Sequence, residues 1–168
     1  MKNIKKEIAT QNSLNNKDAP KREFSISDTK KLYCEINNRV LEGLEVITCN
    51  SKSNEKISHI KKEYLDLLLS RIKFKAQKEY DKELKVWTIV IKELNLYGEG
   101  YTESAAVEDL VDSVIEFAGL YLNKTSLFTK TESINKQVYM LKILRSANDR
   151  ALLAKELGLG LGLGDAVK

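Results

Sequence analysis

The sequence predicts an α+β fold made of two small units: a β-α-β-β-α unit, then a unit that runs strand, turn, long helix, strand, helix. Two observations support this prediction. Apolar residues recur at helical spacing in three separate segments. Short β-branched runs of strand length lie between them. The 168 residues suffice for one ordinary domain or two very small ones, and no repeat of about 20–50 residues indicates a solenoid.

The first unit is predicted to begin after a tail. Residues 1–20 are rich in Lys, Asn and Gln and are expected to be flexible. Residues 22–26 are predicted as a short strand, after which Ser27 or Asp28 can cap a helix that starts at Thr29. This unit is expected to span residues 21–85.

The rest of the first unit follows from its turn residues. Gly43 fits the end of the first helix, where a left-handed backbone suits glycine. The β-branched run 45–49 and the alternating run 56–60 predict two strands, because residues 50–54 have the composition of a turn. Residues 63–74 carry an apolar stripe and predict a second helix.

The second unit is expected to begin at residue 86. The preceding segment, 75–85, is almost wholly charged and either extends the helix into solvent or links the units. Residues 86–91 give the strongest strand signal in the chain, and residues 94–97 can form another strand. Gly98-Glu99-Gly100 is predicted as a turn, and Thr102 as the cap of a long helix.

The remaining elements complete an extension over residues 86–157. The long helix should run to about Leu122. Residues 137–144 are predicted as a final strand and residues 149–157 as a final helix. The Gly/Leu tail, residues 158–168, is of low complexity and is expected to be frayed.

Few residue types in the chain suit catalysis. His59 is the only histidine, lies in a predicted strand, and is expected to be structural or surface-exposed. With Cys34 and Cys49 it supplies too few ligands for a structural zinc site. We therefore expect no catalytic residues, no metal and no enzymatic activity.

One acidic cluster keeps an alternative open. Four carboxylates form a stripe on the long helix: Glu108, Asp109, Asp112 and Glu116. Clustered carboxylates can hold a divalent cation for phosphoester cleavage, so a metal-dependent nuclease is one hypothesis. An acidic stripe opposite an apolar face is also typical of any solvated helix.

Charge is distributed unevenly. Residues 21–85 carry 15 basic and 11 acidic side chains, whereas residues 86–125 carry two basic and seven acidic ones. Lys30 and Lys31 fall in the first turn of the predicted helix, where cations oppose the helix dipole. That placement makes more sense if phosphates approach this end, since neutralising phosphates drives DNA binding. Charge alone nevertheless favours the alternative that these are ordinary surface lysines.

The chain shows no targeting segment for a membrane. No stretch approaches about 18 consecutive apolar residues, and the N-terminal lysines precede no apolar signal core. The two cysteines form no close-spaced motif, which suits free thiols in a reducing compartment. A cytoplasmic location is therefore expected.

The first unit resembles the Phd/YefM antitoxin fold. The similar segments are Arg22–Asp28, Asn38–Gly43, Glu45–Asn50 and Ile57–Tyr64, in which Ile47-Thr48-x-Asn50 and Glu63-Tyr64 match the family pattern well. Ser51 and Lys61 depart from it, standing where glycine and a capping serine are usual. The second unit, from Trp87 through Gly98-Glu99-Gly100 to Leu110, resembles the extension of a PHD-like subgroup of RelE-type systems, and also HicB-like antitoxins.

This resemblance implies an antitoxin that forms a homodimer, neutralises a RelE-like toxin and represses its own operon. The implied contacts to operator DNA are Lys21, Arg22, Lys30, Lys31, Asn50 and Lys52. The implied contacts to the toxin are Leu65, Leu68, Leu69 and Ile72, as in helix-in-groove binding. No cofactor is implied. The apolar stripe equally fits the protein's own core, and an interaction module without DNA binding remains an alternative.

Overall fold

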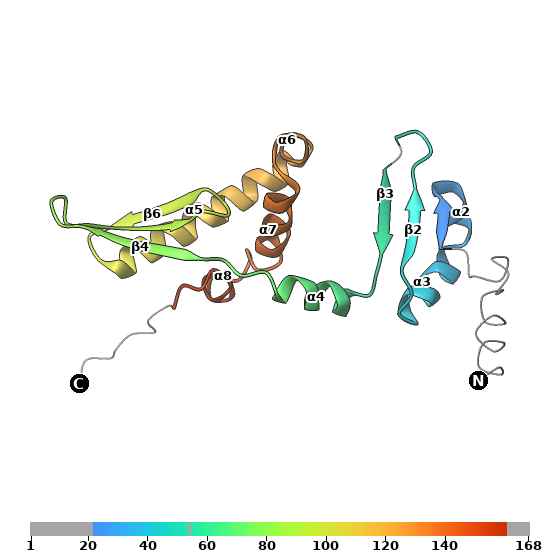
Figure 1. Ribbon diagram of the computed structural model, residues 1–168, viewed down its shortest axis with the longest axis horizontal. Helices are drawn as coiled ribbons and strands as arrows, with labels where there is room; N and C mark the ends of the chain where they lie inside the picture. Colours follow the sequence, from blue (N-terminus) through green and yellow to red (C-terminus); the bar gives the residue numbers. More distant parts are fainter. Residues whose placement is uncertain (1–21, 54, 161–168) are drawn as a thin grey trace, which may run out of the picture. The chain divides into compact units, whose positions relative to one another are not determined.

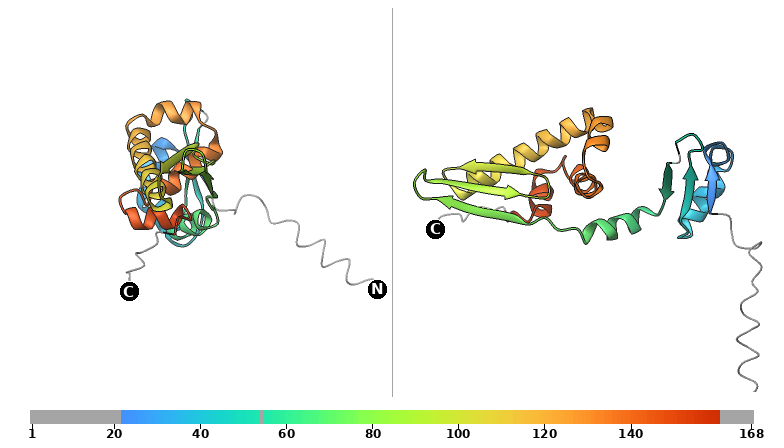
Figure 2. Two further views of the ribbon diagram at one scale, coloured as in Figure 1. Left: turned by 90° about the vertical axis from the view of Figure 1, so that its left-hand side faces the viewer. Right: turned by 45° about the horizontal axis from the view of Figure 1, so that its top comes forward.

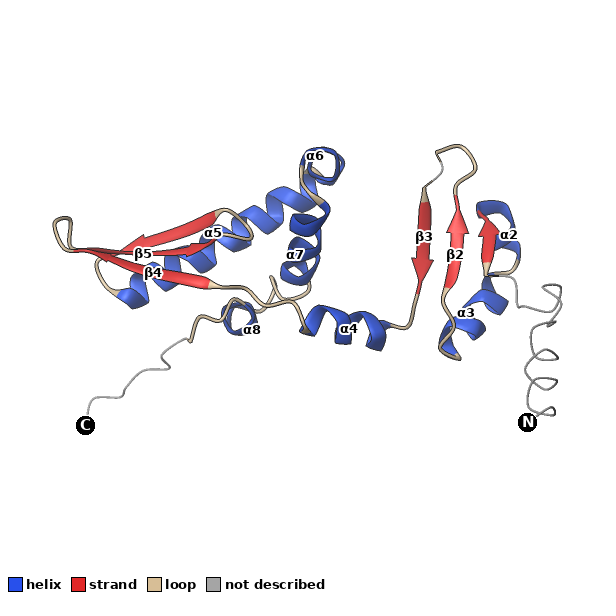
Figure 3. Cartoon of the chain, viewed as in Figure 1, coloured by secondary structure: helices blue, strands red, loops and turns tan. Residues whose placement is uncertain are grey.

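The computed structural model describes residues 22–53 and 55–160 and divides the chain between Asp66 and Leu67 into two compact units (Figure 1). Each unit contains one three-stranded sheet, and the described residues contain seven helices (Figure 3). The predicted α+β class is therefore confirmed. None of the helices described is long and apolar enough to cross a bilayer.

The N-terminal unit is built on a mixed sheet. Strand β1 (Glu23–Ser25) lies parallel to β2 (Val46–Cys49), and β2 lies antiparallel to β3 (Lys56–His59). Helices α2 (Ile26–Lys31) and α3 (Tyr33–Leu41) connect β1 to β2. The core of this unit comprises three buried residues with Val40 packed against them: Phe24, Ile36 and Val46.

Helix α2 begins earlier than predicted. The Ser25 hydroxyl accepts the Asp28 amide at 3.1 Å, so Ser25 is the N-cap, and the prediction of Ser27 or Asp28 was wrong. The chain passes from strand to helix without a loop, a transition that the extended Ser25 backbone allows (ψ 159°). The helix then breaks at Leu32, which separates α2 from α3.

Gly43 ends α3 as predicted. Its φ is +96°, its amide donates to the Val40 carbonyl at 3.0 Å, and the next amide, of Leu44, donates to the Arg39 carbonyl at 3.0 Å. This pair of hydrogen bonds is a Schellman motif, which satisfies the last carbonyls of the helix. Helix α4 (Lys62–Ser70) follows β3 and ends four residues before the predicted limit.

The C-terminal unit opens with the antiparallel strands β4 (Ala76–Asp81), β5 (Val86–Ile91) and β6 (Leu96–Gly100). Strand β5 has the predicted bounds. The prediction that residues 75–85 extend a helix or form a linker was wrong, because they contain an edge strand whose exposed polar side chains conceal it. Asp81 closes the following turn by accepting the amides of Glu83 and Leu84 at 2.8 and 2.9 Å. A boundary after residue 85 would cut this hairpin.

The Gly98-Glu99-Gly100 segment lies inside β6 rather than in a turn. The turn falls earlier, at residues 92–95, where Asn95 has a φ of +57°. A Cβ atom on Gly98 would lie 2.2 Å from the Leu110 nitrogen and 2.5 Å from the Ala106 carbonyl oxygen. Both glycines therefore let helix α5 approach the backbone of β6 directly.

Helix α5 (Glu103–Asn123) confirms the predicted long helix. The Thr102 hydroxyl accepts the Ala105 amide at 3.1 Å and caps its start. The helix runs along one face of the β4–β6 sheet (Figure 2). Its buried side chains are Ala106, Val107, Leu110, Val111, Val114, Ala118 and Tyr121.

Three shorter helices follow: α6 (Thr125–Thr131), α7 (Ile134–Leu144) and α8 (Arg150–Glu156). Helix α8 was predicted and is capped by Asp149, whereas α6 was not. The strand prediction for 137–144 was wrong. Met140 and Ile143 are fully buried at helical spacing, and Ser133 caps the helix through the Lys136 amide.

Part of the Gly/Leu segment belongs to the core. Leu157 and Leu159 are 0% and 1% exposed and pack with the apolar residues of the C-terminal unit. Gly158 lies between them with a φ of +73°, which suits glycine at a helix end. The expectation of a frayed tail was wrong for Gly158 and Leu159. Residues 1–21 and 161–168 lie outside the described part.

Candidate functional site

The predicted DNA contacts at the start of the first unit are exposed where the structure describes them. Arg22, Lys30 and Lys31 are exposed, and Lys21 lies outside the described residues. Lys30 and Lys31 occupy the last turn of α2. The prediction that they lie in the first turn was therefore wrong, and the helix dipole favours cations at their observed position.

Asn50 and Lys52 lie in the β2–β3 turn, as predicted. The Asn50 side-chain oxygen accepts the Lys52 amide at 3.1 Å and thereby shapes the turn, and the Lys52 side chain is exposed. Because β1 and β2 are parallel, this turn and the start of α2 lie at the same end of the sheet, whereas Arg22 lies at the other. The structure therefore gathers only part of the predicted set.

A hydrogen-bonded chain of side chains joins α2 to both longer strands of this sheet. The Thr29 hydroxyl donates to the Ser25 carbonyl at 2.9 Å, so its oxygen accepts the buried Thr48 hydroxyl, also at 2.9 Å. Thr48 in turn accepts from His59 Nε2 at 2.9 Å. His59 therefore carries a proton on Nε2 and has a structural role.

The other face of this sheet carries an ion pair between its two outer strands. Lys56 Nζ lies 2.8 Å from Glu23 Oε1. This hydrogen bond, with the attraction of the opposite charge, lowers the pKa of Glu23 and raises the pKa of Lys56. Both cysteines of the chain are free thiols, Cys34 exposed and Cys49 half-buried.

Helix α4 divides the predicted toxin contacts between two faces. Leu68 is 54% exposed, but Leu69 is buried at 5% and Leu65 and Ile72 are half-buried. Leu69 is therefore not an accessible contact in this structure, and Ile72 lies beyond the end of the helix. The exposed apolar face of α4 has helical i, i+3, i+4 spacing and consists of Tyr64, Leu67 and Leu68, at 46%, 56% and 54% exposed. The sequence stripe identified the helix but not which face is open.

Two of the four carboxylates in the acidic stripe of α5 are engaged in structural contacts. Asp112 pairs with Arg150 of α8, and Asp109 accepts the Glu99 amide of β6 at 2.9 Å. The hydrogen bond from Arg150 lowers the pKa of Asp112. Within residues 22–53 and 55–160, no group of three or more potential ligands could hold a metal ion. The stripe therefore gives no support to a nuclease.

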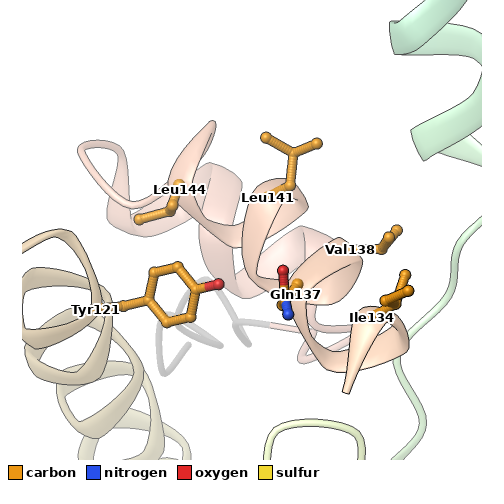
Figure 4. A pocket seen from close by; sticks show the side chains of 6 residues that line it. All are labelled: Tyr121, Ile134, Gln137, Val138, Leu141 and Leu144. Carbon is orange, nitrogen blue, oxygen red and sulfur yellow. The ribbon is translucent and has the colours of Figure 1, made fainter. Parts of the chain in front are cut away.

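An apolar groove of about 310 Å³ lies between α5 and α7 (Figure 4). Tyr121 of α5 points toward α7, and Gln137 is the polar residue among those that line the groove. The other lining residues are Ile134, Val138, Leu141 and Leu144. Ile134 is 78% exposed, so this is an open surface feature.

The described residues thus offer surfaces suited to binding, and the comparisons with known proteins agree. A family model described as "PHD_like: Antitoxin of toxin-antitoxin, RelE / RelB, TA system" matches residues 21–155. The chain belongs to this PHD-like antitoxin family. Since the match covers both units, the C-terminal unit is part of the family's common architecture.

A solved structure supports the same fold. A protein from Syntrophomonas wolfei subsp. wolfei, whose crystal structure is described as that of an antitoxin, superposes with a TM-score of 0.60. The alignment covers 81% of this chain and 96% of that one at 14% sequence identity, so it supports the fold alone. The search among curated proteins gave no match.

Proposed function

We propose that this PHD-like antitoxin neutralises a RelE-type toxin by binding it, and represses its own operon by binding operator DNA as a homodimer. The proposal is that of a cytoplasmic binding protein that needs neither cofactor nor catalysis. The observation that carries the toxin-binding part is the exposed apolar face of α4, formed by Tyr64, Leu67 and Leu68.

The geometry of this face suits helix-in-groove recognition. Three large apolar side chains at i, i+3 and i+4 form one stripe, which is the pattern that anchors an amphipathic helix in a partner's groove. Polar side chains flank the stripe, and one pair of them is fixed, since Lys62 Nζ lies 2.6 Å from Asp66 Oδ2. The predicted contact Leu68 stays in this proposal, with Tyr64 and Leu67 in place of Leu69.

The toxin-binding part is tested with a RelE-type toxin, to be sought first in the reading frame next to the gene of this chain. Leu67→Glu with Leu68→Glu should abolish co-purification and neutralisation, because it places two charges in an apolar contact. Leu127→Glu is the matched control, since Leu127 is also half exposed, at 52%, but lies on α6. Equal binding by the α4 variant and the control would contradict the proposal.

The DNA-binding part rests on the exposed cations of the N-terminal unit. Four exposed cations lie around the small sheet of this unit: Arg22, Lys30, Lys31 and Lys52. Contacts between such side chains and phosphates would make the affinity for DNA depend on salt. A second copy of the chain is proposed to cover the exposed apolar residues of this unit and to provide a symmetric pair of cationic surfaces.

Operator binding is tested by charge reversal. Lys30→Glu with Lys31→Glu should abolish binding to duplex DNA from the operon's promoter, whereas Lys82→Glu with Lys92→Glu, the same change of charge in the C-terminal unit, should leave it intact. Binding of the wild-type chain should fall steeply with salt. If the toxin binds but no duplex does, the protein is an interaction module without DNA binding.

A further inference from the structure

The sheet of the C-terminal unit has one face covered by α5 and one that no described element covers (Figure 2). Successive side chains of a strand point to opposite faces of its sheet. Ile89 and Ile91 are fully buried on the α5 face, so Thr88 and Val90 of β5 point to the other face. The strand register places Glu79 of β4 and Glu99 of β6 on that same side. We name this side the outer face.

The Gly-Glu-Gly pattern of β6 determines the position of Glu99. Gly98 and Gly100 must face α5, because a Cβ on either glycine would lie within 2.6 Å of a backbone atom of α5. Alternation along the strand then directs Glu99 to the outer face. Its amide is held by the Asp109 carboxylate at 2.9 Å, which fixes the strand edge at this position.

Two carboxylates lie in one row across the outer face. Glu79 pairs with Thr88, and Thr88 pairs with Glu99, so the two acids are about 10 Å apart, two strand spacings. Neither side chain makes an ion pair within the described residues. The next row contains Gln77, Val90 and Tyr97, of which Tyr97 is 59% exposed.

The nearest lysine on β4 does not neutralise this row. Lys78 alternates to the α5 face, where it pairs with Glu103. A row with two carboxylates repels nucleic acid and also repels a second copy of the same face, while Val90 and Tyr97 beside it offer an apolar contact. It is complementary to a protein surface with two cationic side chains around an apolar contact.

We propose that the outer face is a second toxin-contacting surface, at which Glu79 and Glu99 bind two arginine or lysine side chains of the toxin and Val90 and Tyr97 cover an apolar part of it. This inference rests on the proposed function, and it gives the C-terminal unit a direct role in neutralisation. Binding at two separate surfaces raises the overall affinity above that of either surface alone.

The test measures the affinity of the full chain for the RelE-type toxin that it neutralises, by calorimetry at low and at high salt. Glu79→Lys with Glu99→Lys should weaken binding by tenfold or more, and Glu79→Gln with Glu99→Gln should weaken it less and flatten its salt dependence. The control is Glu42→Lys with Glu116→Lys, the same change of charge at exposed positions away from the outer face. Circular dichroism and unfolding curves check that each variant is folded.

The outcomes separate the two proposals. If the charge-reversed outer face binds the toxin as the control does, while the α4 variant has lost binding, the inference is overturned and the proposed function stands. If the wild-type chain does not bind the toxin, both are overturned. If the outer-face variant changes the oligomeric state by sedimentation and leaves toxin affinity unchanged, the face contacts a second copy and the inference is again wrong.

Discussion

The two units of the antitoxin differ in how much core each one contains. Among the residues that the structure describes, seventeen buried apolar residues form the core of the C-terminal unit, whereas three form that of the N-terminal unit. The described part of the N-terminal unit also exposes more large apolar residues than it buries, and those outside the α4 face are Ile26, Leu32, Tyr33, Leu41, Leu44 and Ile57. A unit of this size with so small a core is expected to need a partner surface. The difference therefore suggests that the C-terminal unit is self-sufficient and that the N-terminal unit is completed by association.

This comparison has a measurable consequence. In urea, the full chain should unfold in two transitions, and only the transition of the N-terminal unit should move to higher urea as protein concentration rises, because association stabilises it by mass action. Fluorescence of Trp87, the single tryptophan, reports the C-terminal unit, and far-UV circular dichroism reports both. A single transition that is independent of concentration would contradict the division of roles.

The largest effect is expected from Gly98→Ala. The new Cβ would lie 2.2 Å from the Leu110 nitrogen, so the α5 backbone must move away from β6. We expect a loss of about 3 kcal/mol or more in the C-terminal transition, measured by urea unfolding. Gly119→Ala is the control: nothing lies within 4 Å of its built Cβ, and replacing a helical glycine should stabilise by about 0.5–1 kcal/mol. Equal effects of the two changes would show that close packing of α5 on β6 does not hold this unit together.

Gly98 also shows where the sequence was informative and where it was not. Periodic apolar segments predicted α5 and β5 with their bounds, because burial of one face sets the pattern. The glycines of β6 indicated a turn by composition, but their cause is the close approach of α5, the next helix along the chain, to the backbone of β6. Strand β4 was missed because it is a polar edge strand, and 137–144 was taken for a strand because a short apolar run suits a buried helix equally well. For the candidate site, the sequence identified α4 but not its open face, since Leu68 and Leu69 differ only in what packs against them.

The next largest effect is expected from Lys142→Met, which tests a polar contact inside the larger core. Lys142 is 6% exposed, and its ammonium donates to the Ile72 carbonyl and to Glu156 Oε2, both at 2.6 Å. Methionine fills a similar volume but leaves that carbonyl and carboxylate without their donor. We expect a loss of about 2–3 kcal/mol, again confined to the C-terminal transition. Lys155→Met, at an exposed position of α8, should change little.

A smaller effect, in the other transition, is expected from Thr48→Val. The substitution keeps the shape of a buried side chain but removes the hydroxyl that joins Thr29 to His59. We expect a loss of about 1–2 kcal/mol, because His59 Nε2 loses its acceptor. These hydrogen-bonded side chains also hold helix α2 on the sheet. The affinity for duplex DNA should therefore weaken as well. Thr88→Val, in the sheet of the C-terminal unit, should leave the first transition unchanged; a shift there would mean that the two units do not unfold independently.

The smallest effect is expected at the surface of the C-terminal unit, from Asp112→Asn. The hydrogen bond from Arg150 lowers the pKa of Asp112 in the folded chain, so the ionised carboxylate stabilises the fold at neutral pH. As pH falls through that lowered pKa, the carboxylate takes up a proton and this contribution disappears. The free energy of unfolding should therefore differ between wild type and Asp112→Asn at neutral pH and converge below the ordinary range of aspartate. Glu116→Gln, one turn further along α5 and without an ion pair in the described residues, should match the wild type at both pH values. A difference at Asp112 that persists in acid would mean that its role is packing or hydrogen bonding rather than charge.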